Sequence, residues 1–526
     1  MSLRAALAGG LLAVLSLSAS AAPLRWAAQN DVLTLDPHSQ NHTTSLTIAA
    51  QVYEGLTRRG ENYQPEPSLA TKWTYISPTQ VRFELRKGIK FHDGSPFTAD
   101  DVVFSFARIR EPQGAMQAYV SGIREIRKVG DHTVDLMLEA PAPLLLQNLV
   151  SFCIMSRAWA EKNRATHTED FKAKDENYAS RNANGTGPYK LLSWTPDQAV
   201  QMAINKDWWD SNKGNITELT YLPIKSAPTR VAALLSGDVD LVTDVPPADY
   251  SRLKADARLK VVEGTEVRTV FFAIDQGSDE LREASVKGKN PFKDKRVREA
   301  LNLALDREAI KRSIMRGLSV PAALMVAPGV NGYDAALDTP LKPDPDKAKK
   351  LLAEAGYPQG FELPLRCPNN RYVNDEQICQ AAVAMWARIG VRARLIAQPM
   401  SLHIQALERL ESPFYLIGIS MPTYDAHQGL QGWGHSVDTR GNGGQNFNRL
   451  ADATLDALVE RIQFEPDIPQ RNALIREALL RVRDEYLFIP VHHQIRPWAM
   501  KPGVRTLHRS NDTFEARFTS VNQPPP

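Results

Sequence analysis

The sequence of 526 residues lacks most of the motifs that mark common catalytic or nucleotide-binding sites. It contains no Walker A lysine loop, no Gly-x-Ser-x-Gly, no His-Glu-x-x-His and no Cys-x-x-Cys. Two pairs of residues remain as candidates for a metal site or a catalytic base. His92-Asp93 lies in a stretch of turn composition, and His492-His493 would point to opposite faces of a strand. We therefore predict that the protein is not an enzyme and has no metal site and no cofactor.

Long apolar runs are missing after the N-terminal segment, because no later stretch approaches the ~20 residues of a membrane-spanning helix. The N-terminal segment has Arg4, an apolar run over residues 5–17, and the small residues Ala19-Ser20-Ala21. This pattern predicts a signal peptide over residues 1–21 that is cleaved after Ala21. No cysteine follows to accept a lipid, so we expect an untethered protein in a Gram-negative periplasm.

A large excess of charge of one sign is also absent. The 63 lysines and arginines face 60 acidic residues, giving a formal net charge of +3, and the basic residues are scattered rather than gathered in a stripe. We therefore expect no nucleic-acid partner. A mature chain of about 500 residues exceeds what one hydrophobic core usually serves, so at least two domains are expected.

Cysteine is scarce, with three residues in the whole chain. In an oxidising compartment thiols that can pair persist as disulfides, and one of three must stay unpaired. Cys367 and Cys379 flank a short polar segment, so we predict a bridge between them that stabilises the fold by roughly 3 kcal/mol. The alternative is two reduced thiols too far apart to bond. Cys153 lies in an apolar stretch and is expected to be a buried small hydrophobe.

Short strand-like runs alternate with amphipathic helical stretches along the chain, which predicts an α/β protein. The strand pattern is clearest over residues 24–28 and 81–86. Helix starts are marked by capping residues and helix ends by glycine. The predicted starts are Thr98 with Asp101, Asp294, Asp306 for a helix ending at Gly317, and Asp344-Pro345 for a helix ending at Gly356.

Eight strings, in this order, resemble the family 5 extracellular solute-binding proteins of ABC importers, which include dipeptide, oligopeptide, glutathione and nickel binders. The resemblance covers nearly all of the mature chain. The strings are Leu35-Asp36-Pro37-His38, Val52-Tyr53-Glu54-Gly55-Leu56, Pro67-Ser68-Leu69-Ala70-Thr71-Lys72-Trp73, the segments 83–94 and 100–105, Gly185-Thr186-Gly187-Pro188-Tyr189, and the segments 234–241 and 296–302. Most of these positions are expected to determine the fold rather than to bind ligand.

The resemblance implies a two-lobed periplasmic binding protein fold, with two α/β lobes joined by two hinge strands. Lobe I would comprise residues 22–275, enlarged by an inserted subdomain at about 46–185. Lobe II would comprise residues 276–489, and residues 490–526 would return to lobe I. A ligand would be enclosed when the lobes close.

The resemblance also implies that three segments contact the ligand. In peptide binders the third segment carries a Trp-x-x-Asp motif, but Ile419 and Pro422 stand here in place of the tryptophan and the aspartate. That aspartate anchors the ligand's α-ammonium group, which proline cannot do. The candidate ligand-binding residues are Ser39, Gln40, Asn41 and His42; Asn370, Arg371 and Tyr372; and Tyr424 and Asp425.

Each of three features in lobe II has two possible interpretations. Asp425 either replaces the missing anchor or caps a helix or turn. Arg371 either pairs with an anionic ligand group or is an ordinary surface arginine. The glycine-rich string over residues 441–447 either approaches the ligand or forms turns.

The resemblance gives a functional hypothesis and two alternatives. The first is a monomeric periplasmic component that binds a peptide or peptide-like solute and delivers it to an inner-membrane ABC permease. The second is a binder of the same fold for a metal chelate, an opine or a sugar. The third, from another class, is a periplasmic hydrolase.

Overall fold

The computed structural model describes residues 22–522. The predicted signal peptide, residues 1–21, lies outside the described residues. Within them, no helix has both the length and the apolar character that a membrane span requires.

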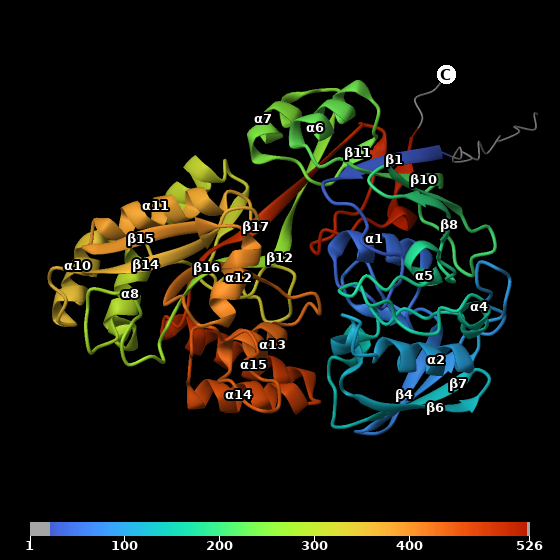
Figure 1. The fold of residues 1–526 in the computed structure, drawn as a ribbon, viewed down its shortest axis with the longest axis horizontal. Helices are drawn as coiled ribbons and strands as arrows, with labels where there is room; N and C mark the ends of the chain where they lie inside the picture. Colours follow the sequence, from blue (N-terminus) through green and yellow to red (C-terminus); the bar gives the residue numbers. More distant parts are fainter. Residues whose placement is uncertain (1–21, 523–526) are drawn as a thin grey trace, which may run out of the picture.

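An 11-stranded mixed sheet runs through the molecule, and two of its strands connect the two lobes (Figure 1). These hinge strands, β12 and β17, pair antiparallel along most of their length. The order is β15-β14-β16-β12-β17-β11-β1-β10-β9-β8, with β13 paired to β17. The bounds are β1 Ala22–Ala28, β8 Tyr189–Thr195, β9 Ala199–Ile204, β10 Ile216–Pro223, β11 Leu241–Val242, β12 Lys260–Ile274, β13 Ser319–Pro321, β14 Phe361–Pro368, β15 Val391–Gln398, β16 Phe414–Ser420 and β17 Ile489–Met500.

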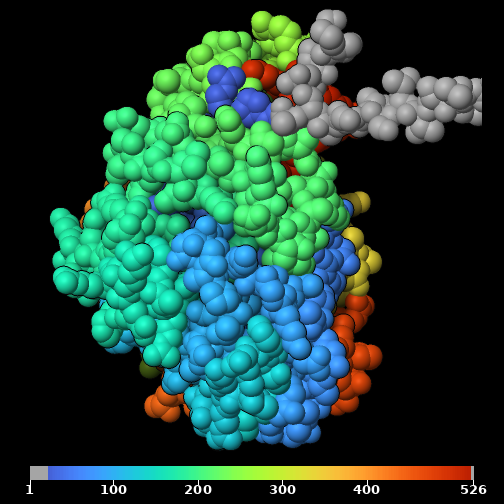
Figure 2. Space-filling view, turned by 90° about the vertical axis from the view of Figure 1, so that its right-hand side faces the viewer, coloured from blue at the N-terminus to red at the C-terminus, as the bar shows by residue number. Residues whose placement is uncertain are grey.

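Lobe I contains one end of this sheet together with a separate four-stranded sheet that has its own hydrophobic core. In Figure 2, lobe I faces the viewer, with the blue-to-cyan second sheet below the green upper part. Its other elements are α1 Thr43–Val52, β2 Thr57–Arg59, β3 Pro65–Pro67, β4 Ala70–Ser77, β5 Gln80–Leu85, α2 Ala99–Ile109, η1 Gln117–Val120, β6 Ile123–Gly130, β7 Thr133–Leu138, α3 Leu145–Asn148, α4 Arg157–Lys162, α5 Tyr178–Arg181, α6 Ala227–Ser236, α7 Pro247–Ala255, β18 Val504–Arg505, η5 Ala516–Phe518 and β19 Ser520–Val521.

Lobe II places helices around strands β14 to β16 at the other end of the sheet (Figure 1). Together the two lobes confirm the predicted two-lobed α/β architecture. The residue limits predicted for the lobes and for the inserted subdomain stay predictions. The helical elements of lobe II are η2 Pro291–Lys293, α8 Lys295–Ala304, α9 Arg307–Ala309, η3 Ile310–Ile314, α10 Pro345–Glu354, α11 Asp375–Ala387, α12 Met400–Glu408, α13 Ala426–Gly429, η4 Leu430–Gly434, α14 Ala453–Phe464 and α15 Ile468–Asp484.

Local sequence signals correctly predict where several elements begin. Thr98 and Asp101 form the capping box of α2, because each side chain pairs with the backbone of the other residue. Asp294 and Asp344 cap α8 and α10 through their carboxylates. The stretch after Asp306 differs from the single predicted helix: the short α9 widens into the π-helical turn η3 before the chain reaches Gly317.

Most of the strings that carry the family resemblance lie in lobe I, and the segment 296–302 lies in α8 of lobe II. Arg108 of α2 makes two hydrogen bonds to the carboxylate of Asp36, at 2.7 and 2.5 Å, and both side chains are fully buried. Gly185 approaches the end of α1 so closely that a Cβ there would lie 1.9 Å from the carbonyl oxygen of Val52. Asp36 and Gly185 therefore have structural roles in lobe I.

Candidate functional site

The candidate site lies between the lobes, beside the hinge strands. Three loops reach it: residues 39–42 before α1 in lobe I, residues 369–374 after β14 in lobe II, and residues 421–425 after β16 in lobe II. Burial, and then the positive charge of Arg371, lowers the pKa of His42. The charge of Arg371 in lobe II therefore acts on His42 in lobe I, which indicates that the first two loops lie near one another.

The loop from lobe I divides into an inner and an outer part. Ser39 is buried and donates a hydrogen bond to the carbonyl of Glu169 at 3.3 Å, while Gln40 donates to the carbonyl of Ser39. These two side chains support the loop. Asn41 is exposed, and the Nδ1 atom of His42 has no hydrogen-bond partner among the described residues. His42 therefore has an unpartnered ring nitrogen in this loop, and Asn41 interacts with the hydroxyl of Tyr119.

The first loop from lobe II is held by a disulfide and a carboxylate. The structure contains the predicted Cys367–Cys379 bridge, which joins the end of β14 to α11 across 12 residues. Asp375 accepts the backbone N–H groups of Arg371 and Tyr372 at 2.9 and 3.0 Å. These contacts hold the backbone of the loop from both sides.

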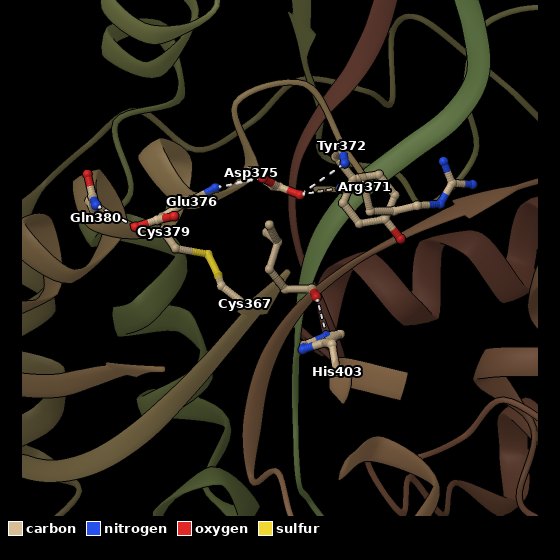
Figure 3. The surroundings of a disulfide bond; sticks show 9 residues. Cys367, Arg371, Tyr372, Asp375, Glu376, Cys379, Gln380 and His403 are labelled. Atoms are coloured by element: carbon tan, nitrogen blue, oxygen red, sulfur yellow. Dashed lines mark hydrogen bonds between the residues drawn. A yellow bond between two sulfur atoms is a disulfide. The ribbon is translucent and has the colours of Figure 1, made fainter. Parts of the chain in front are cut away.

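The side chains of this loop face different surroundings. Figure 3 shows the guanidinium of Arg371 directed away from the disulfide. It is exposed, stands 5.4 Å from the ring centre of Tyr372, and has no carboxylate partner within residues 22–522. Tyr372 is buried and donates its hydroxyl to Gly418 at 3.3 Å. Asn370 is exposed but its side chain accepts the first N–H of α12 from Met400. Arg371 is therefore the free charged group of the loop.

Asp425 caps a helix and is fully engaged inside lobe II. It caps α13 by accepting the N–H of His427 at 2.9 Å. Arg471 of α15 donates two hydrogen bonds to the carboxylate, at 2.7 and 2.8 Å, and Asn331 donates a third at 2.9 Å. Of the two roles considered from the sequence, the structure shows the capping role. Asp425 offers no free carboxylate to the cleft.

Tyr424 makes contacts between the lobes. Its ring stacks on Tyr63 of lobe I at a centroid distance of 4.8 Å, and the guanidinium of Arg59 lies 4.3 Å from its ring centre. Arg59 also donates to the carbonyl of Pro422 at 3.3 Å. Burial raises the pKa of Tyr424 to about 12. We call Arg59, Tyr63, Pro422 and Tyr424 the interlobe latch.

Sequence reasoning missed the lobe I half of this latch. Arg59 and Pro422 lie 363 positions apart, and no local pattern around Arg59 or Tyr63 marks either residue. A helix cap or a strand is encoded by neighbours in sequence, whereas a contact between lobes is not.

The sequence matches the model of the bacterial extracellular solute-binding proteins, family 5, over residues 64–441. The chain belongs to this family. Heme-binding protein A of Haemophilus influenzae is 28% identical over 507 residues, covering 90% of this chain and 88% of that protein. The periplasmic oligopeptide-binding protein OppA of Escherichia coli is 26% identical over 510 residues, covering 90% and 88%. Both names describe binding proteins rather than enzymes.

Solved structures show the same fold. The structure of HbpA2 from Haemophilus parasuis superposes with a TM-score of 0.81 at 24% identity, covering 95% of this chain and 100% of that one. The two-lobed periplasmic binding protein fold predicted from the sequence is thereby confirmed.

Two acidic groups beside the cleft of this family 5 solute-binding protein are already paired. Glu266 on hinge strand β12 accepts hydrogen bonds from Arg268 at 3.0 Å and Gln494 at 2.8 Å. Asp425 is engaged by Arg471. Arg371 and Arg59 have no carboxylate partner in the described chain. Arg371 and Arg59 therefore contribute positive charge that no carboxylate of the described chain neutralises in an ion pair.

A cavity of about 180 Å³ lies beside the latch, between lobe I and the turn at Pro422. Glu54 lines it and accepts hydrogen bonds from Thr186, Trp208 and Trp209 at 2.8–3.3 Å, while burial raises the pKa of this carboxyl.

Proposed function

We propose that the protein is the periplasmic substrate-binding component of an ABC importer. It captures a peptide or peptide-like solute as a monomer by closing its hinge, and it delivers that solute to an inner-membrane permease. The observation that best supports this proposal is the set of loops from both lobes that lie near one another beside β12 and β17. Membership of the solute-binding family supports the same conclusion.

The mechanism depends on a difference in contacts between two conformations. A ligand that touches both Arg371 of lobe II and His42 of lobe I makes the full set of contacts only when the lobes are closed. It therefore shifts the equilibrium toward the closed form by the free energy of those additional contacts. Arg371 would bind a carboxylate of the solute, because a guanidinium and a carboxylate form two parallel charge-assisted hydrogen bonds.

A second candidate is a non-peptide solute such as a metal chelate, an opine or a sugar. The charges at the cleft support this second candidate. A free peptide amino terminus needs an anionic partner, yet Asp425 is paired with Arg471 and Pro422 has no acidic group. A solute with a carboxylate and no free ammonium group can pair its carboxylate with Arg371, and it has no ammonium group that would need an anionic partner.

Native mass spectrometry of freshly purified mature protein tests both candidates, before and after incubation with a dipeptide library. A retained intact peptide supports the first candidate, and a co-purified non-peptide ligand supports the second. Recovery of cleaved peptides would contradict a binding function. Small-angle scattering with the retained ligand should show a smaller radius of gyration, and an unchanged radius would contradict hinge closure.

The same ligand then tests the role of Arg371. Replacing a charged hydrogen-bond donor at a bound carboxylate costs about 1.5–3 kcal/mol, so Arg371→Gln should weaken binding by roughly 10- to 150-fold in calorimetry. Arg388→Gln, at the exposed end of α11 in the same lobe, is the matched control and should leave the affinity within about twofold. Equal affinities for wild type and R371Q would place the anion-binding group elsewhere.

A further inference from the structure

A histidine and two carboxylates meet in lobe II, in the loop between η4 and α14. His435 follows η4, Asp438 lies three residues later, and Glu460 projects from α14. One ligand-type atom from each side chain lies within 4.8 Å of the other two. His435 is buried, whereas Asp438 and Glu460 are 21% and 40% exposed, so the cluster opens toward solvent on its acidic side.

The glycine-rich string that follows gives this loop its shape. Asp438 accepts backbone N–H groups from Arg440 at 2.8 Å and Asn442 at 3.0 Å. Gly443 has φ +69°, and a Cβ at this position would lie 2.7 Å from the carbonyl oxygen of His435. The string therefore folds back onto the segment that carries His435 and Asp438. Of the two roles considered from the sequence, the structure shows the turn-forming role for this glycine.

The hydrogen bonding of His435 leaves one ring nitrogen ready to accept a cation. Its Nδ1 lies 2.6 Å from the carbonyl oxygen of Ser436, and a carbonyl can only accept, so Nδ1 carries a proton. Its Nε2 is buried, has no hydrogen-bond partner among the described residues, and lies 3.5 Å from a carboxylate oxygen of Glu460. In the neutral imidazole, the Nε2 lone pair would face a negative charge. A cation between the two groups removes this repulsion.

We propose that His435, Asp438 and Glu460 bind a first-row divalent cation, with Zn²⁺ as the probe of choice. An imidazole nitrogen and carboxylate oxygens suit Zn²⁺, Ni²⁺ and related ions, and a ring nitrogen whose partner N–H is bonded to a backbone carbonyl is the usual arrangement of a ligating histidine. Zn²⁺ holds such ligands at about 2.0–2.2 Å, so the partly exposed carboxylates turn inward when the ion binds.

Arg440 competes with the ion for the carboxylates of Asp438 and Glu460. Its guanidinium donates to Asp438 at 3.0 Å and also pairs with Glu460, while its side chain is 64% exposed. Because exposed ion pairs are weak, the guanidinium can leave the carboxylates without disturbing the fold. The apparent Zn²⁺ affinity is therefore lower than the three ligands alone would give.

Calorimetric titration of metal-stripped mature protein without a polyhistidine tag, using ZnCl₂, tests the proposal. Wild type should bind one Zn²⁺ at this site, and Glu460→Gln and Asp438→Asn should each weaken that binding at least tenfold. Arg440→Gln breaks the same ion pairs but keeps all three ligands, so it should strengthen binding severalfold. The exposed pair of His167 and Glu111 supplies the control, and His167→Gln should bind as wild type does.

The variants separate a metal site from a structural ion-pair cluster. Both E460Q and R440Q remove the contact between Arg440 and Glu460, and only the loss of a metal ligand lowers Zn²⁺ affinity. Zn²⁺ binding to E460Q at wild-type affinity, weaker binding by R440Q, or no binding to wild type would each overturn the proposal. Thermal unfolding gives a second readout, with a Zn²⁺-dependent rise in Tm expected for wild type and R440Q and not for E460Q.

Discussion

Truncating Tyr424 to alanine should move the protein toward its open form. The change removes the stack on Tyr63, and such an aromatic pair contributes about 0.5–1.5 kcal/mol. It also removes the contact with Arg59, a cation–π interaction of about 0.5–2 kcal/mol. Together, the closed form should lose about 1–3.5 kcal/mol of stabilisation. Because these contacts join the two lobes, a loss of about 1–3.5 kcal/mol should lower ligand affinity by roughly 5- to 400-fold.

The assay for this prediction pairs calorimetry with small-angle scattering. The ligand identified by native mass spectrometry is titrated into wild type, Tyr424→Ala and Tyr424→Phe. The phenylalanine variant keeps the ring and loses only a 3.5 Å contact between hydroxyl groups of Tyr424 and Ser510, so it should stay within about twofold of wild type. Tyr424 has a positive φ, which alanine adopts no more readily than tyrosine does. The alanine variant and wild type therefore have the same backbone strain at this position.

Two outcomes would refute the reasoning about the latch. If Y424A binds with wild-type affinity and gives the same radius of gyration with ligand, the interlobe contacts contribute nothing to closure. If Y424F loses as much affinity as Y424A, the hydroxyl rather than the ring carries the effect. The second result would indicate direct hydrogen bonding of Tyr424 to the ligand.

Three further predictions concern stability, each measured by urea unfolding. Arg471→Met leaves the buried Asp425 carboxylate without its partner and should cost about 3–5 kcal/mol, whereas equal stability would show that the pair is unimportant. Reducing the Cys367–Cys379 bridge, or replacing both cysteines by serine, should cost about 3 kcal/mol for a 12-residue separation, and no change would mean that the reduced loop keeps its order. His492→Phe should leave stability at pH 7 unchanged or raise it by about 1 kcal/mol, because neither ring nitrogen of His492 has a hydrogen-bond partner in the described chain. Burial lowers the pKa of His492 to about 3, so the unfolded state binds the extra proton between pH 6.5 and 3 and wild type loses stability as pH falls through that range. At pH 5 the variant should therefore gain about 2 kcal/mol more over wild type, and a pH-independent difference would show that His492 has the same pKa in the folded and unfolded states.

The sequence alone determined the elements whose causes lie within a few residues. The carboxylates of Asp294 and Asp344 cap helices that begin one residue later, and the alternating pattern around residues 81–86 marks strand β5. Such signals act locally, because a cap or a strand face depends on side chains one to four positions apart. The disulfide was predictable for a related reason, since its two cysteines are close in sequence.

The roles of the candidate site residues depended on the tertiary structure. Asp425 is a helix cap rather than a free ligand anchor because Arg471, 46 positions later, uses its carboxylate. Tyr424 contacts the other lobe because the hinge strands bring Tyr63 and Arg59 beside it. Whether a carboxylate or a ring is free for a ligand depends on which distant residues are packed against it. No local pattern in the sequence encodes that arrangement.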